Sequence, residues 1–146
     1  MTSATNGPRT GPFWDAAEGR SPLPPAAATL GFELVGADPD EGTLEVAFTA
    51  GHAFTTPLGH VLGGFLAAML YDTVGPTVLA GLEPGRFIST LDLTTTFVRE
   101  TGPGRLVGRG RIVRREGDTN VVEATLTAAD GAVVATATSV VQVVDL

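Results

Sequence analysis

The chain has 146 residues, of which 43% are hydrophobic and 17% charged, and this composition fits one compact domain with a buried core. Sixteen acidic residues against nine basic ones give a net charge of −7, so nucleic acid and anionic membranes are poor partners. All the basic residues are arginine and there is no cysteine, which excludes lysine Schiff bases, disulfides and cysteine-bound metals. With only two histidines, we expect no metal site and no cofactor.

Residues 1–28 are rich in proline and glycine, and we predict that they form an extended or partly disordered arm with one short helical turn at 14–18. The folded domain is expected over residues 29–146. The polar start of the chain lacks the apolar stretch of a signal peptide, so we expect a cytoplasmic protein.

Residues 30–35 and 43–49 are predicted to form a β-hairpin. The sequence Asp-Pro-Asp-Glu-Gly between them favours a tight turn, and residues 43–49 alternate between apolar and polar or small side chains. One face of this hairpin is therefore expected to be buried.

A long apolar stretch follows at residues 61–82. Its length would suit a membrane span, but Asp72 lies in its middle and several Gly and Pro residues interrupt it. We therefore predict a helix that is buried on nearly all sides inside a globular fold.

The rest of the chain reads as β-strands. They are expected at residues 87–99, 105–115, 120–129 and 132–144. In the second of these, Gly108 and Gly110 occur among the inward-facing positions, where they either let the helix approach the backbone closely or mark bulges. An antiparallel sheet that curls around one apolar helix is the architecture that this order favours.

Four segments, in this order and spacing, resemble the hotdog-fold acyl-CoA thioesterase family, in the branch of phenylacetic-acid-pathway thioesterases. They are Glu-Gly-Arg-Ser-Pro at 18–22, Pro-Leu-Gly-His-Val-Leu-Gly-Gly at 57–64, Thr-Leu-Asp-Leu at 90–93, and Asp-Gly at 130–131 followed by Ala-Thr-Ala-Thr. The resemblance implies an α+β hotdog fold, in which a curved antiparallel sheet wraps around one long central helix. It also implies a homodimer or a tetramer of two dimers.

The family resemblance implies hydrolysis of a small-molecule acyl thioester, linked either to coenzyme A or to acyl-carrier protein. The amides of Gly63 and Gly64, at the start of the helix, would polarise the thioester carbonyl, since helix N-termini present unpaired donors. The glycine pair is equally compatible with tight packing of the helix. Thr90 matches the hydroxyl that helps to hold the attacking water in the family. The family's carboxylate acts on the same carbonyl from the neighbouring subunit's side of the dimer interface.

Three positions depart from the family pattern. Thr56 occupies the position where relatives commonly have Asn, and Leu62 the position where they have His or Gln. Tyr71 occupies the position of the catalytic carboxylate. Asp72 comes one residue after that carboxylate position and points about 80° away from the direction of Gly64 around the helix. Asp72 is therefore either the general base, a structural carboxylate that caps or pairs across the dimer, or a residue without a role.

The other candidate residues are expected to bind substrate. Tyr71 would either orient the carbonyl or a water, or plug the acyl pocket, which Thr56 and Leu62 also line. His60 is a further pocket candidate, although packing of the loop or of an interface explains it as well. Arg114 and Arg115 could bind the phosphates of coenzyme A, but the arginines of this stretch also fit a solvated outer face balanced by acids.

Two rival functions remain open on the sequence alone. One is a non-hydrolytic acyl-binding or CoA-binding hotdog protein that has lost the catalytic carboxylate. The other is a hotdog enzyme of altered chemistry, such as a lyase or cyclase. A position of the Asp72 carboxylate in a pocket shared with the Gly64 amide in the dimer would favour hydrolysis.

Overall fold

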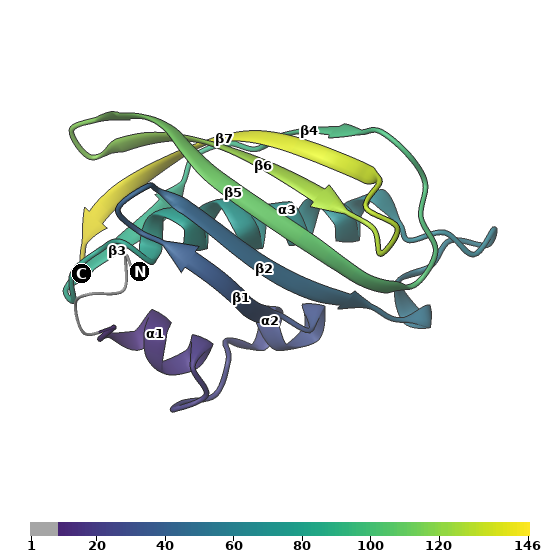
Figure 1. The fold of residues 1–146 in the computed structure, drawn as a ribbon, viewed down its shortest axis with the longest axis horizontal. Helices are drawn as coiled ribbons and strands as arrows, with labels where there is room; N and C mark the ends of the chain where they lie inside the picture. The colour runs from purple at the N-terminus through teal and green to yellow at the C-terminus, as the bar shows by residue number, and fades with distance from the viewer. Residues whose placement is uncertain (1–8) are drawn as a thin grey trace.

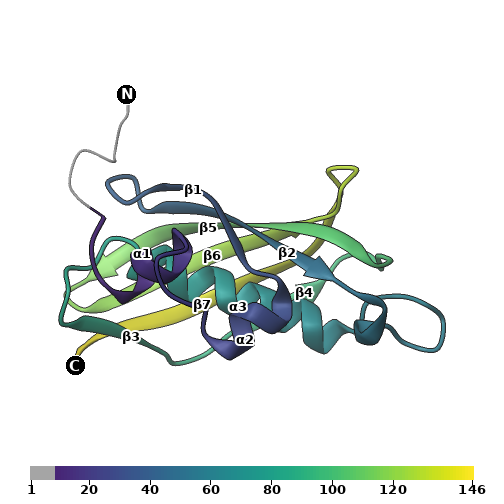
Figure 2. The same cartoon turned by 90° about the horizontal axis from the view of Figure 1, so that it is seen from below.

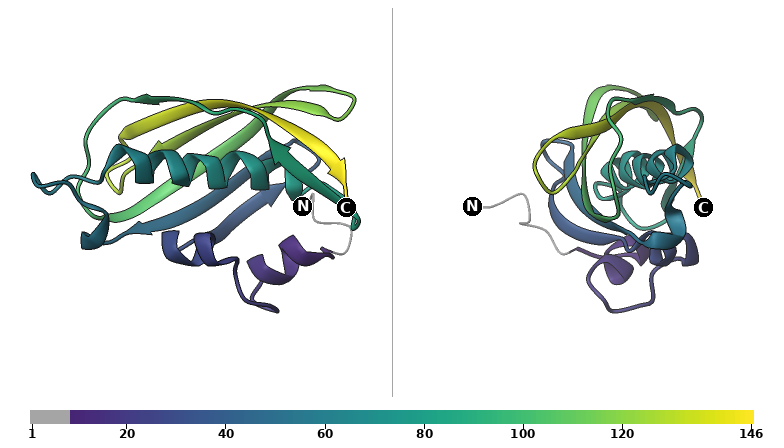
Figure 3. Two further views of the ribbon diagram at one scale, coloured as in Figure 1. Left: turned by 180° about the vertical axis from the view of Figure 1, so that it is seen from behind. Right: turned by 90° about the vertical axis from the view of Figure 1, so that its right-hand side faces the viewer.

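A curled antiparallel sheet encloses one long helix in the computed structural model, which describes residues 9–146. Helix α3 (Gly63–Leu79) lies in the concave face of a seven-stranded sheet, as Figure 1 shows from the side and the right panel of Figure 3 shows along the helix axis. The strand order is β1-β2-β5-β6-β7-β3, and β4 also pairs with β7. The expected α+β hotdog architecture is therefore confirmed.

The structure sets the bounds of each element. The strands are β1 (Glu33–Asp38), β2 (Thr43–Ala50), β3 (Arg86–Thr90), β4 (Thr94–Phe97), β5 (Gly104–Glu116), β6 (Thr119–Thr127) and β7 (Val133–Asp145). Besides α3, the helices are α1 (Pro12–Ala17), α2 (Pro25–Leu30) and the short 3₁₀ helix η2 (His52–Phe54).

The predicted strand at residues 87–99 is in fact two strands. Between β3 and β4, the Asp92 carboxylate accepts the Val140 backbone N–H at 2.8 Å, and the Ser139 hydroxyl donates to the Asp92 carbonyl at 2.6 Å. These bonds replace part of the ladder with β7, so the edge bends at residues 91–93. Side chains that hydrogen-bond to the backbone in place of another strand do not change the alternation of apolar and polar residues, so the sequence pattern does not show them.

The arm is more ordered than expected over its described part. The predicted helical turn is α1, but α2 occupies residues where we expected first an extended segment and then the start of a strand. Pro25 at the first helical position and the alanines after it favour the helix, and Gly31 ends it in the left-handed conformation, with φ 69°. Figure 1 shows α1 and α2 beneath α3, and Figure 2, seen from below, shows them in front of it. Residues 1–8 of the expected arm lie outside the described residues.

Helix α3 is buried as predicted. Its core-facing side chains are packed among the inner faces of the sheet; they include Leu66, Met69, Leu70, Val74 and Val78. Within residues 9–146, none of the helices combines the length and the apolarity needed to cross a membrane.

Two glycines of β5 let α3 approach the sheet. A Cβ at Gly110 would lie 3.1 Å from the Cβ of Thr77 and 3.4 Å from the carbonyl oxygen of Thr73, and a Cβ at Gly108 would collide with the hydroxyl of Thr73. The bulge in this strand lies beyond them, between Ile112 and Arg114. Close approach, rather than bulging, therefore explains both glycines.

Gly110→Ala is expected to lower the free energy of unfolding by about 1–3 kcal/mol, because the added methyl has no space between β5 and α3. Urea unfolding followed by circular dichroism measures the change. Gly36→Ala is the matched control, since a Cβ there meets nothing within 4 Å. Equal midpoints for the two variants would contradict the close contact.

Candidate active site

The start of α3 presents two free amides. Gly63 and Gly64 are its first two residues and follow Leu62, whose carbonyl accepts the N–H groups of Phe65 at 2.9 Å and Leu66 at 3.3 Å. Within residues 9–146, no acceptor takes the N–H of Gly63 or Gly64. The two donors therefore lie at the positive end of a 17-residue helix, where they can polarise a carbonyl oxygen.

The two glycines have different surroundings. A Cβ at Gly63 would lie 3.1 Å from the ring of Phe97, whereas a Cβ at Gly64 would have only the Leu62 side chain nearby, at 3.9 Å. Packing thus accounts for the absence of a side chain at Gly63. No contact of that kind demands glycine at Gly64, and its role as a donor stays a prediction.

Asp72 borders a cavity of about 500 Å³ between α3, β3 and the arm. Its Oδ2 atom is buried and has no hydrogen-bond partner among the described residues. Burial raises the pKa of this carboxyl from 3.8 to about 6. Among residues 9–146, no other Asp or Glu and no Arg or His lines the cavity, so these residues supply no countercharge and the carboxylate can accept a proton near neutral pH.

Strand β3 brings Thr90 to the same cavity. Gly75 makes this possible, since a Cβ there would lie 2.8 Å from the Ile88 side chain and 3.9 Å from the Thr90 hydroxyl. Tyr71 also lines the cavity and is 52% exposed. The structure therefore brings together three of the predicted site residues, Asp72, Thr90 and Tyr71.

A second hollow, of about 340 Å³, lies at the start of α3. Thr56, His60 and Gly63 line it, and the Nδ1 atom of His60 is 2.9 Å from a carboxylate oxygen of Glu100. Leu62 does not line it and is half exposed.

The helix separates the two groups of predicted residues. Gly64 and Asp72 are eight residues apart on α3, which corresponds to about 12 Å along the helix axis. One chain therefore does not place the free amides and the carboxylate on the same small group. Among the described residues, no three His, Asp or Glu side chains are grouped so that they could hold a metal ion.

Comparisons with known proteins show the family of the chain. The model of the acyl-CoA thioesterase N-terminal domain matches residues 53–142, which is more than half of the chain. A phenylacetic acid degradation-related protein from Ralstonia eutropha JMP134 is 40% identical, with 89% of this chain and 98% of that chain covered and a TM-score of 0.85. The chain belongs to the acyl-CoA thioesterase family.

More distant structures share the fold of this thioesterase. A thioesterase from Haemophilus influenzae is 18% identical, with 94% of this chain and 93% of that chain covered and a TM-score of 0.80. The PaaI protein of the phenylacetic acid degradation operon of E. coli is 17% identical, with 90% and 93% covered and a TM-score of 0.78. No curated protein sequence matches the chain significantly. The expected hotdog thioesterase, a hydrolase of acyl thioesters, is confirmed.

The arginines of the thioesterase lie mainly on the outer face of the sheet, paired with acids. These pairs are Arg99–Asp130, Arg105–Glu33, Arg109–Glu45, Arg111–Glu123 and Arg114–Glu116. Arg115 lies near Gly42 and lines a hollow next to the C-terminal end of α3. The pairs support a solvated, charge-balanced face, and phosphate binding by Arg114 and Arg115 stays a prediction.

The sequence did not reveal that the arm lines the Asp72 cavity of the thioesterase. The arm residues that line it come from α1, from α2 and from the segment between them; they are Pro12, Phe13, Ala16, Ala17, Leu23, Pro24 and Ala27. The adjacent aromatic residues Phe13 and Trp14, in an otherwise small and polar segment, were the available signal. Aromatic side chains in such a segment indicate that it packs against a core.

Proposed function

We propose that the thioesterase hydrolyses an acyl-CoA or acyl-carrier-protein thioester with Asp72 as the general base. The observation that carries this proposal is the buried Oδ2 atom of Asp72, which has no hydrogen-bond partner among the described residues, at a cavity that Thr90 also lines. In this role Asp72 takes a proton from a water that Thr90 helps to hold. The water attacks the thioester carbonyl, the carbon–sulfur bond breaks, and the thiol leaves with a proton.

We further propose that the amides of Gly63 and Gly64 stabilise the oxyanion from a second copy of the chain. Two donors aimed at a developing oxyanion can contribute about 3–4 kcal/mol. The separation of about 12 Å along α3 calls for a partner, because one chain cannot supply both groups to one carbonyl. A homodimer would join the amides of one copy to the carboxylate of the other.

The edge formed by β3 and β4 supports this assembly. It carries exposed apolar side chains at Leu91, Phe97 and Val98, which are 58%, 56% and 55% exposed. An edge strand with such residues is a template for pairing with another chain. Whether two dimers form a tetramer, and the cytoplasmic location, stay predictions.

The non-hydrolytic alternative rests on Leu62 and Tyr71, which stand where relatives have a polar side chain and the carboxylate. Thioester cleavage by the purified protein over a panel of acyl-CoAs separates the two functions. The panel should include phenylacetyl-CoA, since two of the similar structures are linked to phenylacetic acid degradation. Binding without release of thiol would establish the alternative.

The rate of hydrolysis is expected to rise with pH through about pH 6 and then to level off. The base form of Asp72 is needed, and burial holds its pKa at about 6. In the described part of the chain, no cationic side chain and no other acidic side chain lines the cavity beside it, and Tyr71 is the one further titratable residue in that lining. The measurement is kcat/KM between pH 4.5 and 8.5. A flat profile across this range would contradict Asp72 as the base.

A further inference from the structure

The Asp72 cavity is polar at one end and apolar at the other. Asp72, Gly75, Pro76 and Leu79 are spaced by three or four residues and form one stripe of α3 about 10 Å long. Thr90 lies near Gly75 in this stripe, whereas Phe87 lines the cavity from the other end of β3. An acyl thioester fits this gradient with its carbonyl near the acid and its apolar chain towards Leu79.

Phe13 closes the apolar end. A neighbouring cavity of about 280 Å³ begins on its far side and extends to Leu82 and Leu146. Phe13, Pro12, Leu79 and Phe87 line both cavities, so they form the partition between them. Of these, Phe13 belongs to the arm and is a large ring whose removal would join the two spaces.

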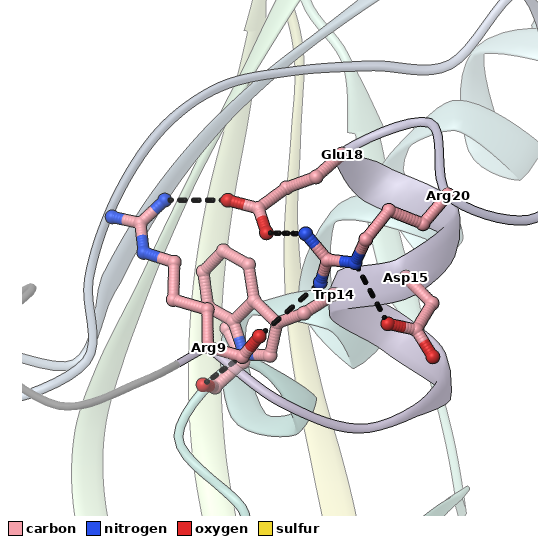
Figure 4. Close-up of polar contacts among 6 residues, drawn as sticks. Arg9, Trp14, Asp15, Glu18 and Arg20 are labelled. Atoms are coloured by element: carbon pink, nitrogen blue, oxygen red, sulfur yellow. Dashed lines mark hydrogen bonds and ion pairs between the residues drawn. The ribbon is translucent and has the colours of Figure 1, made fainter.

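The arm holds Phe13 in place through its neighbour Trp14. The Trp14 indole N–H donates to the carbonyl of Ala80, the residue that ends α3, at 3.2 Å, and the Phe13 ring meets the Trp14 ring edge-on at 5.2 Å. The Arg9 guanidinium lies 4.4 Å from the centre of the Trp14 ring, and Glu18 is 3.6 Å from Arg9. Figure 4 shows Arg9, Trp14 and Glu18 together.

Arg20 forms hydrogen bonds with residues before, within and after α1. Its guanidinium donates to Asp15 at 3.0 Å, to Glu18 at 2.8 Å and to the carbonyl of Arg9 at 3.2 Å. Several linked charges restrict a short helix more than one exposed pair does. These bonds help to hold α1, and with it Phe13, in place beside the cavity.

We propose that the arm forms the closed end of the acyl pocket and that Phe13 determines the length of the acyl group accepted. The substrate class is then a thioester of an apolar acyl group of medium length, which fills the space between Asp72 and Phe13. This inference rests on the proposed function, because it takes Asp72 as the position of the carbonyl.

The test is kcat/KM for straight-chain acyl-CoAs of short, medium and long chain in three variants. Phe13→Ala opens the pocket into the neighbouring cavity, so the ratio of long-chain to medium-chain kcat/KM should rise about tenfold or more. Ala17→Leu adds bulk to the wall of the same pocket, so the preference should move to short chains. Ala28→Leu is the matched control, because Ala28 is exposed on α2 and lines neither cavity.

The outcomes separate this inference from the proposed function. Opposite shifts in the Phe13 and Ala17 variants, with the wild-type profile kept by Ala28→Leu, would support it. Hydrolysis with one unchanged chain-length profile in all variants would overturn the role of Phe13 and leave the function standing. If Phe13→Ala does not fold, Ala17→Leu alone decides, since an unchanged profile there also overturns the inference. Absence of hydrolysis of every thioester by the wild type would overturn the proposed function, and this inference with it.

Discussion

Asp72→Asn is expected to lower kcat for acyl-CoA hydrolysis by about 10²–10⁴-fold with little change in KM. The amide keeps the shape of the side chain, and the cavity holds no other carboxylate to replace the base. Release of free thiol under steady-state conditions measures the effect. Glu41→Gln is the matched control, because it makes the same carboxyl-to-amide change at an exposed residue that does not line the cavity and should keep the activity.

The same substitution is expected to stabilise the protein, which separates lost chemistry from lost folding. Burial raises the pKa of Asp72 from 3.8 to about 6, so the folded state holds this proton more tightly than the unfolded state. The contribution of Asp72 to the free energy of unfolding therefore falls as pH rises from about 4 to about 6. Above about pH 6 the contribution stays at this lower value. At pH 7.5, Asp72→Asn should gain up to about 3 kcal/mol in the free energy of unfolding, and the gain should vanish below pH 4. Unchanged kcat in this variant would remove Asp72 from the mechanism.

Trp14→Ala is expected to lower the free energy of unfolding by about 3–5 kcal/mol. Trp14 is 4% exposed, which is unusual for a residue so near the chain start, and its indole caps the end of α3 through Ala80. Its removal leaves a large void and an unpaired carbonyl. Thermal and urea unfolding measure the loss.

Two variants calibrate the Trp14 result. Trp14→Phe keeps most of the buried ring and loses the hydrogen bond to Ala80, which should cost about 1 kcal/mol. Glu18→Gln weakens the exposed ion pairs with Arg9 and Arg20 and should cost less than about 1 kcal/mol. A loss in Trp14→Ala no larger than in Glu18→Gln would mean that the arm adds nothing to the folded core.

The architecture could be predicted because each layer of the fold leaves a periodic signal. Alternation in β2 and in β5 follows from burial of one face of each strand. The largely apolar character of α3 follows from its enclosure by the sheet. The break at Asp92 could not be predicted in this way, because it depends on two hydrogen bonds to residues nearly fifty positions away.

The site could be predicted only in part. Asp72 was found because a lone acid in an apolar helix needs an explanation, and the structure places Thr90 at its cavity. The participation of Phe13 could not be deduced, since proline-rich segments do not show which surface they pack against. The distance between Gly64 and Asp72 was implicit in the helical rise, and it is the reason for our proposal that a second copy completes the site.

The close contact of β5 with α3 has a consequence for how a carboxylate can be relocated in this fold. The Gly108 and Gly110 backbone lies against Thr73 and Thr77, so rotating or sliding the helix would disrupt this close packing. A change from an acid at position 71 to one at position 72 therefore turns the group by a full step of about 100°, with no intermediate setting. In a helix packed this closely, an acidic side chain can point in only a few directions, one for each sequence position. The residues that face the position carrying the acid must then be compatible with it.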